Sequence, residues 1–288
     1  NNDRYQYVLP YYNYSRSYIP SNNLGTFNFY FTGNNKLTNT NNLTTTSVND
    51  LNYESFDYFS NKGFKNNFGV YVKNINTIAK NNSKYKNSLQ INEMSMFEFK
   101  SALPMSKTNS ESYNLFTPKI SVRVNPQNNM KNHKNSNKII TANNVFDINR
   151  LGISDSLEGG KSITFGLDYK IDLFDQYYSS NLDMEEGDEE EDTTKWRSII
   201  FPEKPKYKDR YLEFKIANVL RDKFEEDIPS SSTINKKSSN IFGSINNHLF
   251  ENIDLEYSFS LDNNLKTFQS HEINSTIYVN NFDWLGKL

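Results

Sequence analysis

The chain has 288 residues, with 32 lysines and arginines against 34 aspartates and glutamates, and it contains no cysteine. The near balance of charge excludes the basic field with which proteins recruit nucleic acid, so no nucleic-acid partner is expected. The absence of cysteine excludes disulfides, thiolate zinc sites and cysteine nucleophiles within these residues.

Tyrosines crowd the first predicted strand, in the stretch YQYVLPYYNYSRSY at 5–18. Aromatic residues make up 15% of the whole sequence, which is far too many for a disordered chain. Tyrosine rings of this kind stack on carbohydrate or form the aromatic girdle at a membrane boundary, where one end of each ring is wet and the other apolar. We favour the girdle, because the rings cluster beside Pro10 and Pro20, where a strand is expected to end.

Alternation of apolar and polar residues is the dominant pattern and predicts β-strands. Phe27, Phe29 and Phe31 share one side of GTFNFYFT, and the stretch IDLEYSFSL alternates in the same way. No amphipathic helix longer than about two turns is expected. About eleven strands are predicted, at 5–14, 25–32, 51–59, 67–73, 89–100, 120–124, 161–171, 210–220, 240–246, 253–261 and 273–279.

The connections between these strands are uneven in length. A long loop is predicted at 126–160 and an inserted acidic turn at 172–208, whereas other connections are short. Structureless loops this long are uncommon in compact soluble domains, while outer-membrane barrels combine short turns at one rim with long loops at the other. No apolar run reaches the roughly 18 residues of a transmembrane helix, but barrel strands need only about 9–11. The prediction is therefore an all-β fold, an antiparallel transmembrane β-barrel, of which 1–288 is a part.

The charges of the predicted strands fall on the side away from the apolar residues. This separation is expected of a barrel wall, whose lumen is wet and whose outer side meets lipid. Ile163, Phe165 and Leu167 are predicted to face lipid. The charged residues predicted to face the lumen are Arg123, Lys161, Asp168, Glu213, Lys215, Asp254 and Glu256.

The sequence offers little that points to catalysis or to a bound metal. His133, His248 and His271 are far apart in the chain, and the acidic run at 183–192 lacks the ordered ligand spacing of a calcium loop. The stretch LEGG is not followed by the lysine and serine or threonine of a phosphate-binding loop, and no nucleophile elbow is present. We therefore expect no enzyme activity, no catalytic residue, no cofactor and no metal.

The stretch NVFDINRLGISDSLEGGKSITFGLDYK at 144–170 resembles a characteristic segment of the LPS-assembly protein family (LptD). In that family an N-x-F-x-x-N-R stretch leads into D-x-x-E-G-G and then into a strand that ends in G-L-x-Y. Further resemblances occur in the same order at 3–15, 116–126, 224–245 and 252–262. The matching loop residues are Asn149, Arg150, Asp155, Glu158, Gly159 and Gly160, and Asn144, Phe146, Gly166, Leu167 and Tyr169 match the flanking positions.

The resemblance implies a very large barrel in the outer membrane of a Gram-negative bacterium, which delivers lipopolysaccharide to the outer leaflet. The implied partners are lipopolysaccharide, an LptE-like lipoprotein that plugs the lumen, and periplasmic proteins of the lipopolysaccharide bridge. This chain corresponds to the central to C-terminal part of the barrel, and the family's N-terminal jellyroll domain is expected to be absent from it. The alternatives are a porin or receptor barrel of the outer membrane and a soluble β-rich adhesin.

The loop residues that carry the resemblance have an expected structural role. Gly159 and Gly160 let the returning loop pass close to neighbouring strands at the rim or inside the lumen. Arg150, Asp155 and Glu158 are expected to hold the loop by charge-assisted hydrogen bonds, and direct contact with passing lipopolysaccharide stays open as a second role.

Overall fold

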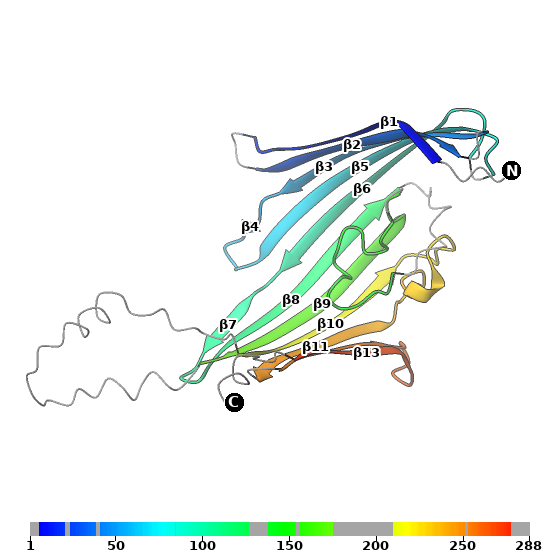
Figure 1. Cartoon of the computed structure of the whole chain (residues 1–288). Coiled ribbons are helices and arrows are strands. Elements are labelled where there is room, and N and C mark those ends of the chain that lie inside the picture. The colour runs from blue at the N-terminus through cyan, green and yellow to red at the C-terminus, as the bar shows by residue number, and fades with distance from the viewer. Residues whose placement is uncertain are drawn as a thin grey trace, which may run out of the picture.

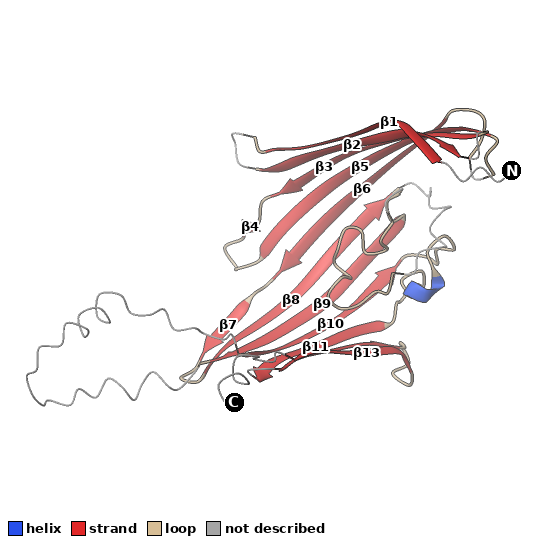
Figure 2. Ribbon diagram, in the orientation of Figure 1, coloured by secondary structure: helices blue, strands red, loops and turns tan. Residues whose placement is uncertain are grey.

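The computed structural model describes residues 6–20, 24–38, 41–83, 85–126, 138–153, 156–174, 210–250 and 253–277 (Figure 2). These residues form one antiparallel sheet, so the predicted all-β class is confirmed. The one helical turn in the described ranges is the 3₁₀ turn η3 (Ser230–Ser232). No helix in the described part of the chain is long and apolar enough to cross a membrane.

The sheet contains thirteen strands. They are β1 (Gln6–Tyr18), β2 (Gly25–Thr38), β3 (Asn42–Ser55), β4 (Tyr58–Phe59), β5 (Lys65–Lys80), β6 (Gln90–Ala102), β7 (Met105–Thr108), β8 (Ser112–Asn125), β9 (Gly160–Leu173), β10 (Tyr211–Arg221), β11 (Ile241–Phe250), β12 (Ile253–Leu261) and β13 (Phe268–Ile277). Eleven of them follow one another across the sheet in chain order, as β1-β2-β3-β5-β6-β8-β9-β10-β11-β12-β13, while β4 pairs with β5 and β7 with β8. Within the described ranges β1 and β13 are its two edges, and the sheet is not closed (Figure 1).

Several element bounds differ from those predicted. The strand predicted at 51–59 is β3, which begins earlier, at Asn42, and pairs along its whole length with β2. Its first half, LTTTS, lacks an apolar alternation, but threonine is β-branched and suits a strand. The long loop is 126–159, because β8 ends at Asn125, and the second long connection is 174–210. The acidic run at 183–192 and His133 lie outside the described residues.

The two long connections leave the sheet at opposite rims. Because every neighbouring pair of strands is antiparallel, the end of β8 and the start of β9 lie at one rim, and the end of β9 and the start of β10 lie at the other. The connection 222–240, between β10 and β11, leaves at the same rim as 126–159. We call the segments 138–153, 156–159 and 222–240 the plug, because they fold back against the sheet.

The register separates the sheet into two chemically different faces. Residues directly opposite each other on paired strands share a face, so Phe165 lies with Ile120, and Thr164 with Ser121. The apolar face carries Phe27, Phe29, Phe31, Leu51, Tyr53, Phe68, Val70, Val72, Phe97, Phe99, Ile120, Val122, Val124, Ile163, Phe165, Leu167, Phe214, Ile216, Leu255, Tyr257 and Phe259. The polar face carries Asn28, Thr32, Asp50, Asn52, Lys73, Glu98, Ser121, Arg123, Ser162, Thr164, Asp168, Glu213, Lys215, Ser244, Asn246, Glu256 and Ser258.

Burial on these two faces is the reverse of that in a soluble sheet. On β9, Thr164 is fully buried at 0% exposure, whereas Phe165 next to it is 45% exposed. The plug lies over the polar face and contacts it from Arg123 on β8 to Glu256 on β12. The sheet therefore curves around the plug, with the polar face on the inside, and Figure 1 shows the plug segments in green and yellow against it.

One residue that was predicted to face inward lies on the apolar face. Lys161 lies opposite Val124 and on the same side of β9 as Ile163, so the prediction that it faces inward with Arg123 is wrong. Side chains two positions apart in a strand point to the same face, so Lys161 lies on the face of Ile163 and not on that of its neighbour Ser162.

Candidate functional site

The plug has a small apolar core of its own. Ile140, Val145 and Leu151 from the first segment pack with Ile228 and Ile234 from the second. Ala217, Val219 and Phe242 from the inner side of β10 and β11 complete this cluster, together with Ala142. The cluster therefore anchors the plug to β10 and β11 through the hydrophobic effect. The inner face has a second apolar area on β5 and β6, where Tyr71, Met94 and Met96 are buried.

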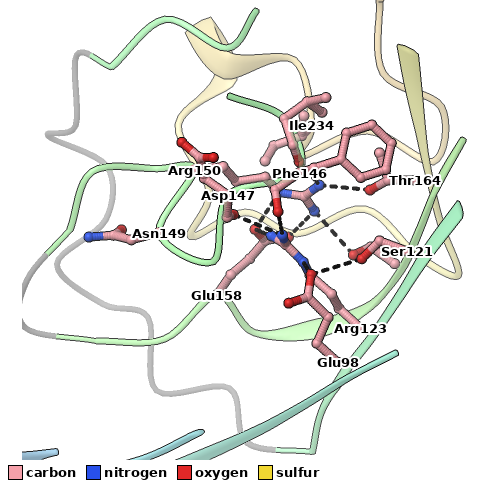
Figure 3. Close-up of polar contacts among 12 residues, drawn as sticks. Glu98, Ser121, Arg123, Phe146, Asp147, Asn149, Arg150, Glu158, Thr164 and Ile234 are labelled. Carbon is pink, nitrogen blue, oxygen red and sulfur yellow. Dashed lines mark hydrogen bonds and ion pairs between the residues drawn. The ribbon is translucent and has the colours of Figure 1, made fainter. Parts of the chain in front are cut away.

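Arg150 and Glu158 meet at the centre of the plug (Figure 3). The guanidinium group of Arg150 donates from Nε to Glu158 Oε2 at 2.6 Å and from Nη2 to Glu158 Oε1 at 2.5 Å. This bidentate arrangement is the strongest geometry for an arginine and a carboxylate. Arg150 is fully buried and also donates to Thr164 Oγ1 at 2.9 Å and to Ser162 Oγ at 3.1 Å. The pair thus fastens the loop to the inner side of β9.

Arg221, the last residue of β10, joins the second plug segment to the same carboxylate. Its Nη2 donates to Glu158 Oε1 in a close contact, and its Nη1 donates to the carbonyl of Gly159 at 3.0 Å. Its Nε donates to the carbonyl of Ile234 at 2.5 Å. Glu158 therefore holds 138–159, β10 and 222–240 together.

Arg123 on β8 supplies a third contact between the wall and the plug. It donates from Nε to Glu98 Oε1 at 2.8 Å on β6, and from Nη2 to the carbonyls of Phe146 and Asp147 at 2.9 and 2.8 Å. Its Nη1 lies 3.6 Å from Glu158 Oε2. We call Glu98, Arg123, Arg150, Glu158 and Arg221 the buried charge cluster.

The electrostatics of this cluster favour an ionised Glu158. Burial alone raises the pKa of a carboxyl group, but the neighbouring guanidinium groups of Arg150, Arg221 and Arg123 outweigh it. The pKa of Glu158 is consequently held well below its ordinary value. A buried ion pair contributes little net stability over an apolar substitute, but loss of one partner leaves a buried charge uncompensated. Glu158 is accordingly the residue on which the plug depends most.

The remaining motif residues shape the loop. The Oδ1 of Asn149 accepts from the amide of Ile153 at 2.8 Å, and Figure 3 shows its side chain pointing away from the charge cluster. Gly160 has a φ of +79°, and a Cβ there would lie 2.5 Å from Glu225 Oε1. The carbonyl of Gly159 is the acceptor for Arg221, while Asp155 lies outside the described residues.

The three residues predicted to face lipid share the apolar face of β9. Ile163 and Phe165 are exposed, and Leu167 is half-buried. Arg123 was predicted to face inward, but no pattern in the sequence connects Arg123, Glu98 or Arg221 with the motif loop. These residues stand 27 to 71 positions from Arg150 and Glu158 in the chain, so only the sheet pairing brings them together.

A cavity of about 380 Å³ lies between the plug and the inner sides of β2, β3 and β5. Its wall on the strands includes Asp50 and Lys73, which form an ion pair at 2.7 Å, beside Tyr30, Val48 and Tyr71. Its wall on the plug includes the apolar side chains of Leu151 and Ile153. A second space, of about 490 Å³, lies over β10 to β13 and is lined by Lys215, His248, Asp254 and Glu256, among others. The plug therefore leaves open spaces that contain charged side chains on both sides of the charge cluster.

The charges of the cluster are engaged with one another or with backbone carbonyls. Within the described ranges, no three His, Asp or Glu side chains lie close enough together to hold a metal ion.

No protein-family model matches this chain, and no curated protein matches it either.

Proposed function

We propose that this chain forms part of the wall of an outer-membrane β-barrel, and that the barrel is the lipopolysaccharide translocon of the LPS-assembly family. The observation that carries the proposal is the reversed polarity of the sheet. Its apolar residues are exposed and its charged residues are covered, which is the arrangement that a membrane wall needs. The all-β antiparallel fold fits such a barrel.

The apolar face is proposed to contact the hydrocarbon core. Hydrocarbon cannot satisfy backbone polar groups, so a spanning sheet must pair its strands and present apolar side chains outward. Ile163, Phe165 and Leu167 on β9, with their neighbours on β8 and β10, supply this surface. The exposed edges of β1 and β13 support pairing with further strands, because an unpaired edge is unfavourable in lipid.

The polar face is proposed to line the route of the lipopolysaccharide sugars and phosphates. Lipopolysaccharide combines acyl chains with a large polar part, so its export needs a polar lumen beside the bilayer. The open spaces on both sides of the charge cluster suit this need, because charged side chains line both of them and the ion pair of Asp50 and Lys73 lies in one. The proposal involves no bond-making step, and the energy for transport comes from elsewhere in a multi-protein bridge.

The proposed partners follow from the resemblance of the motif at 144–170. They are lipopolysaccharide, an LptE-like lipoprotein within the lumen and periplasmic proteins of the lipopolysaccharide bridge. The proposed location is the outer membrane of a Gram-negative bacterium.

Membrane fractionation of the full-length protein tests the first part of this proposal. We expect the protein in the outer-membrane fraction after alkaline extraction, and we expect unheated protein to migrate on a denaturing gel differently from heated protein, as folded barrels do. Recovery in the soluble fraction without heat-modifiable migration would contradict the barrel and favour a soluble β-rich adhesin.

Depletion of the protein in its host tests the second part. We expect surface lipopolysaccharide to fall while the porins of the outer membrane stay at their usual level, and a lipoprotein to co-purify with the barrel. Unchanged surface lipopolysaccharide with impaired uptake of small solutes would favour a porin or receptor instead.

A further inference from the structure

An aromatic groove lies on the apolar face, at the rim opposite the plug. Its volume is about 420 Å³, and it is formed where β3 ends, β4 turns back and β5 begins, next to the end of β6. Tyr53, Phe68 and Phe99 line it from the long strands, Tyr58 lines it from β4, and Leu24 and Phe56 line it from the connections. Figure 1 shows β4 beside β5 at this end of the sheet. The groove is separate from the cavities beside the plug, because it opens on the other face.

The floor of the groove is apolar and consists of packed aromatic rings. The ring of Tyr53 lies 4.7 Å from that of Phe27 and 5.8 Å from that of Phe68, measured between centroids. The hydroxyl of Tyr53 donates to the carbonyl of Leu24 at 3.0 Å, so the polar end of this ring is already satisfied. The floor therefore presents hydrocarbon, and it continues along β5 into Val70 and Val72 of the apolar face.

The apolar side chains around the floor of the groove are strongly exposed. Tyr58 is 68% exposed and Leu24 is 63% exposed, and Phe56 and Phe59 in the same connection are exposed as well. Such a concentration of large apolar side chains at a strand end is characteristic of the boundary between membrane and water.

The outer edge of the groove carries one cation and one anion. Lys65 Nζ lies 2.8 Å from Asp57 Oδ2, and both side chains are well exposed. Asn67 Nδ2 donates to the other oxygen of Asp57 at 3.4 Å, which holds the carboxylate at the groove. A cation and an anion side by side at the end of an apolar channel complement a phosphate and an ammonium group on one molecule.

We propose that this groove binds one phospholipid with a zwitterionic headgroup, such as phosphatidylethanolamine. One acyl chain lies along Tyr53, Phe68 and Phe99, the phosphate contacts Lys65 and the ammonium group contacts Asp57. The inference rests on the proposed function, because it requires the apolar face to meet a bilayer. It adds a site for a resident lipid at the rim opposite the plug, apart from the route of the transported molecule.

Lipid retention by the full-length protein tests this inference. The purified protein is incubated with equal amounts of phosphatidylethanolamine and phosphatidylglycerol, and the lipids that stay bound are counted by native mass spectrometry. We expect one retained phosphatidylethanolamine, and about tenfold weaker retention in Tyr58→Ser, because this variant loses a ring that the bound lipid would cover. The control is Phe250→Ser, which removes an exposed ring at the same rim but outside the groove.

A charge variant tests the headgroup assignment. Asp57→Lys places two cations at the groove edge and is expected to reverse the preference from phosphatidylethanolamine to phosphatidylglycerol. Equal retention of the two lipids by the unmodified protein, or no change in either variant, would overturn the inference. A photoreactive side chain at position 58 that labels a protein instead of a lipid would overturn it too.

The lipid site and the proposed function can be refuted separately. A protein that fractionates with the outer membrane and shows heat-modifiable migration, but retains no phosphatidylethanolamine, refutes the lipid site alone. A protein that is soluble refutes both.

Discussion

The two faces of β9 contrast within a single strand. Thr164 and Ser162 are buried against Arg150, whereas Phe165 and Ile163 are exposed. In a soluble sheet the apolar residues would form the core, but here the covered face is held mainly by charges and hydrogen bonds. The two faces are therefore stabilised by different means, and they should respond differently to substitution.

The inner face depends on the buried charge cluster. The apolar core of the plug is small, and Glu158 alone joins Arg150 and Arg221. The apolar face has no such cluster within the described residues, and its rings contact one another in small groups, such as Tyr53 with Phe27 and Phe68. A single charge removed from inside should therefore matter more than a single ring altered outside.

Glu158→Gln is expected to have the largest effect. It leaves the guanidinium groups of Arg150 and Arg221 buried without their anion, which typically costs about 3–5 kcal/mol. The free energy of unfolding, measured by denaturant titration of the refolded full-length protein in detergent, should fall by this amount. Glu226→Gln, which changes an exposed carboxylate in the plug segment 222–240, is the matched control and should leave the free energy unchanged. Equal effects of the two substitutions would show that the cluster does not hold the plug.

Phe165→Arg tests the opposite face. An arginine facing lipid near the middle of a bilayer costs about 2–4 kcal/mol, so folding into lipid vesicles should be weakened by that amount. Asn274→Arg places the same side chain on the polar face of β13, beside the cavity over β10 to β13, and should be tolerated. If Phe165→Arg folds into vesicles as well as Asn274→Arg does, the apolar face does not contact lipid.

Gly160→Ala tests the turn that leads from the plug into β9. A non-glycine residue at a φ of +79° is strained, and its Cβ would press on the carboxylate of Glu225. We expect a loss of about 1–3 kcal/mol in the free energy of unfolding. The double variant Gly160→Ala, Glu225→Ala removes the clash but not the backbone strain, so it should lose less than the two single variants together. Full additivity of the two losses would mean that the clash plays no part.

Much of the fold could be predicted from the sequence because alternation reports directly which residues share a face. The stretch at 253–261 was placed at its observed bounds, and the number of main strands agrees with the prediction. β3 was predicted to begin too late because LTTTS carries no apolar signal, and its place is set by pairing with β2. The short strands β4 and β7 were missed as separate elements for a similar reason, because each is defined by the neighbour with which it pairs.

Only the part of the candidate site that lies within one loop could be predicted from the sequence. Arg150 and Glu158 stand eight positions apart in one motif, so the sequence places them in the same loop. Arg123, Glu98 and Arg221 belong to strands that reach the cluster through the register of β6, β8, β9 and β10. No local pattern marks such a residue, because a charge on the polar face of a strand looks the same whether it faces water or a buried partner.

The smallest effect is expected from pH within the neutral range. The pKa of Glu158 is lower in the folded protein than the ordinary value of about 4.3, so its ionised form stabilises the fold above that value. This contribution is complete at neutral pH and is lost as the pH falls below about 4 toward the folded pKa. Limited proteolysis of the plug at a fixed protease activity should therefore be constant between about pH 8 and 5, and should increase only in stronger acid. In Glu158→Gln the acid-induced increase that is due to this group should be missing, because glutamine does not titrate. An increase already near neutral pH in the unmodified protein would mean that a different group, and not the carboxylate at the centre of the plug, controls its release.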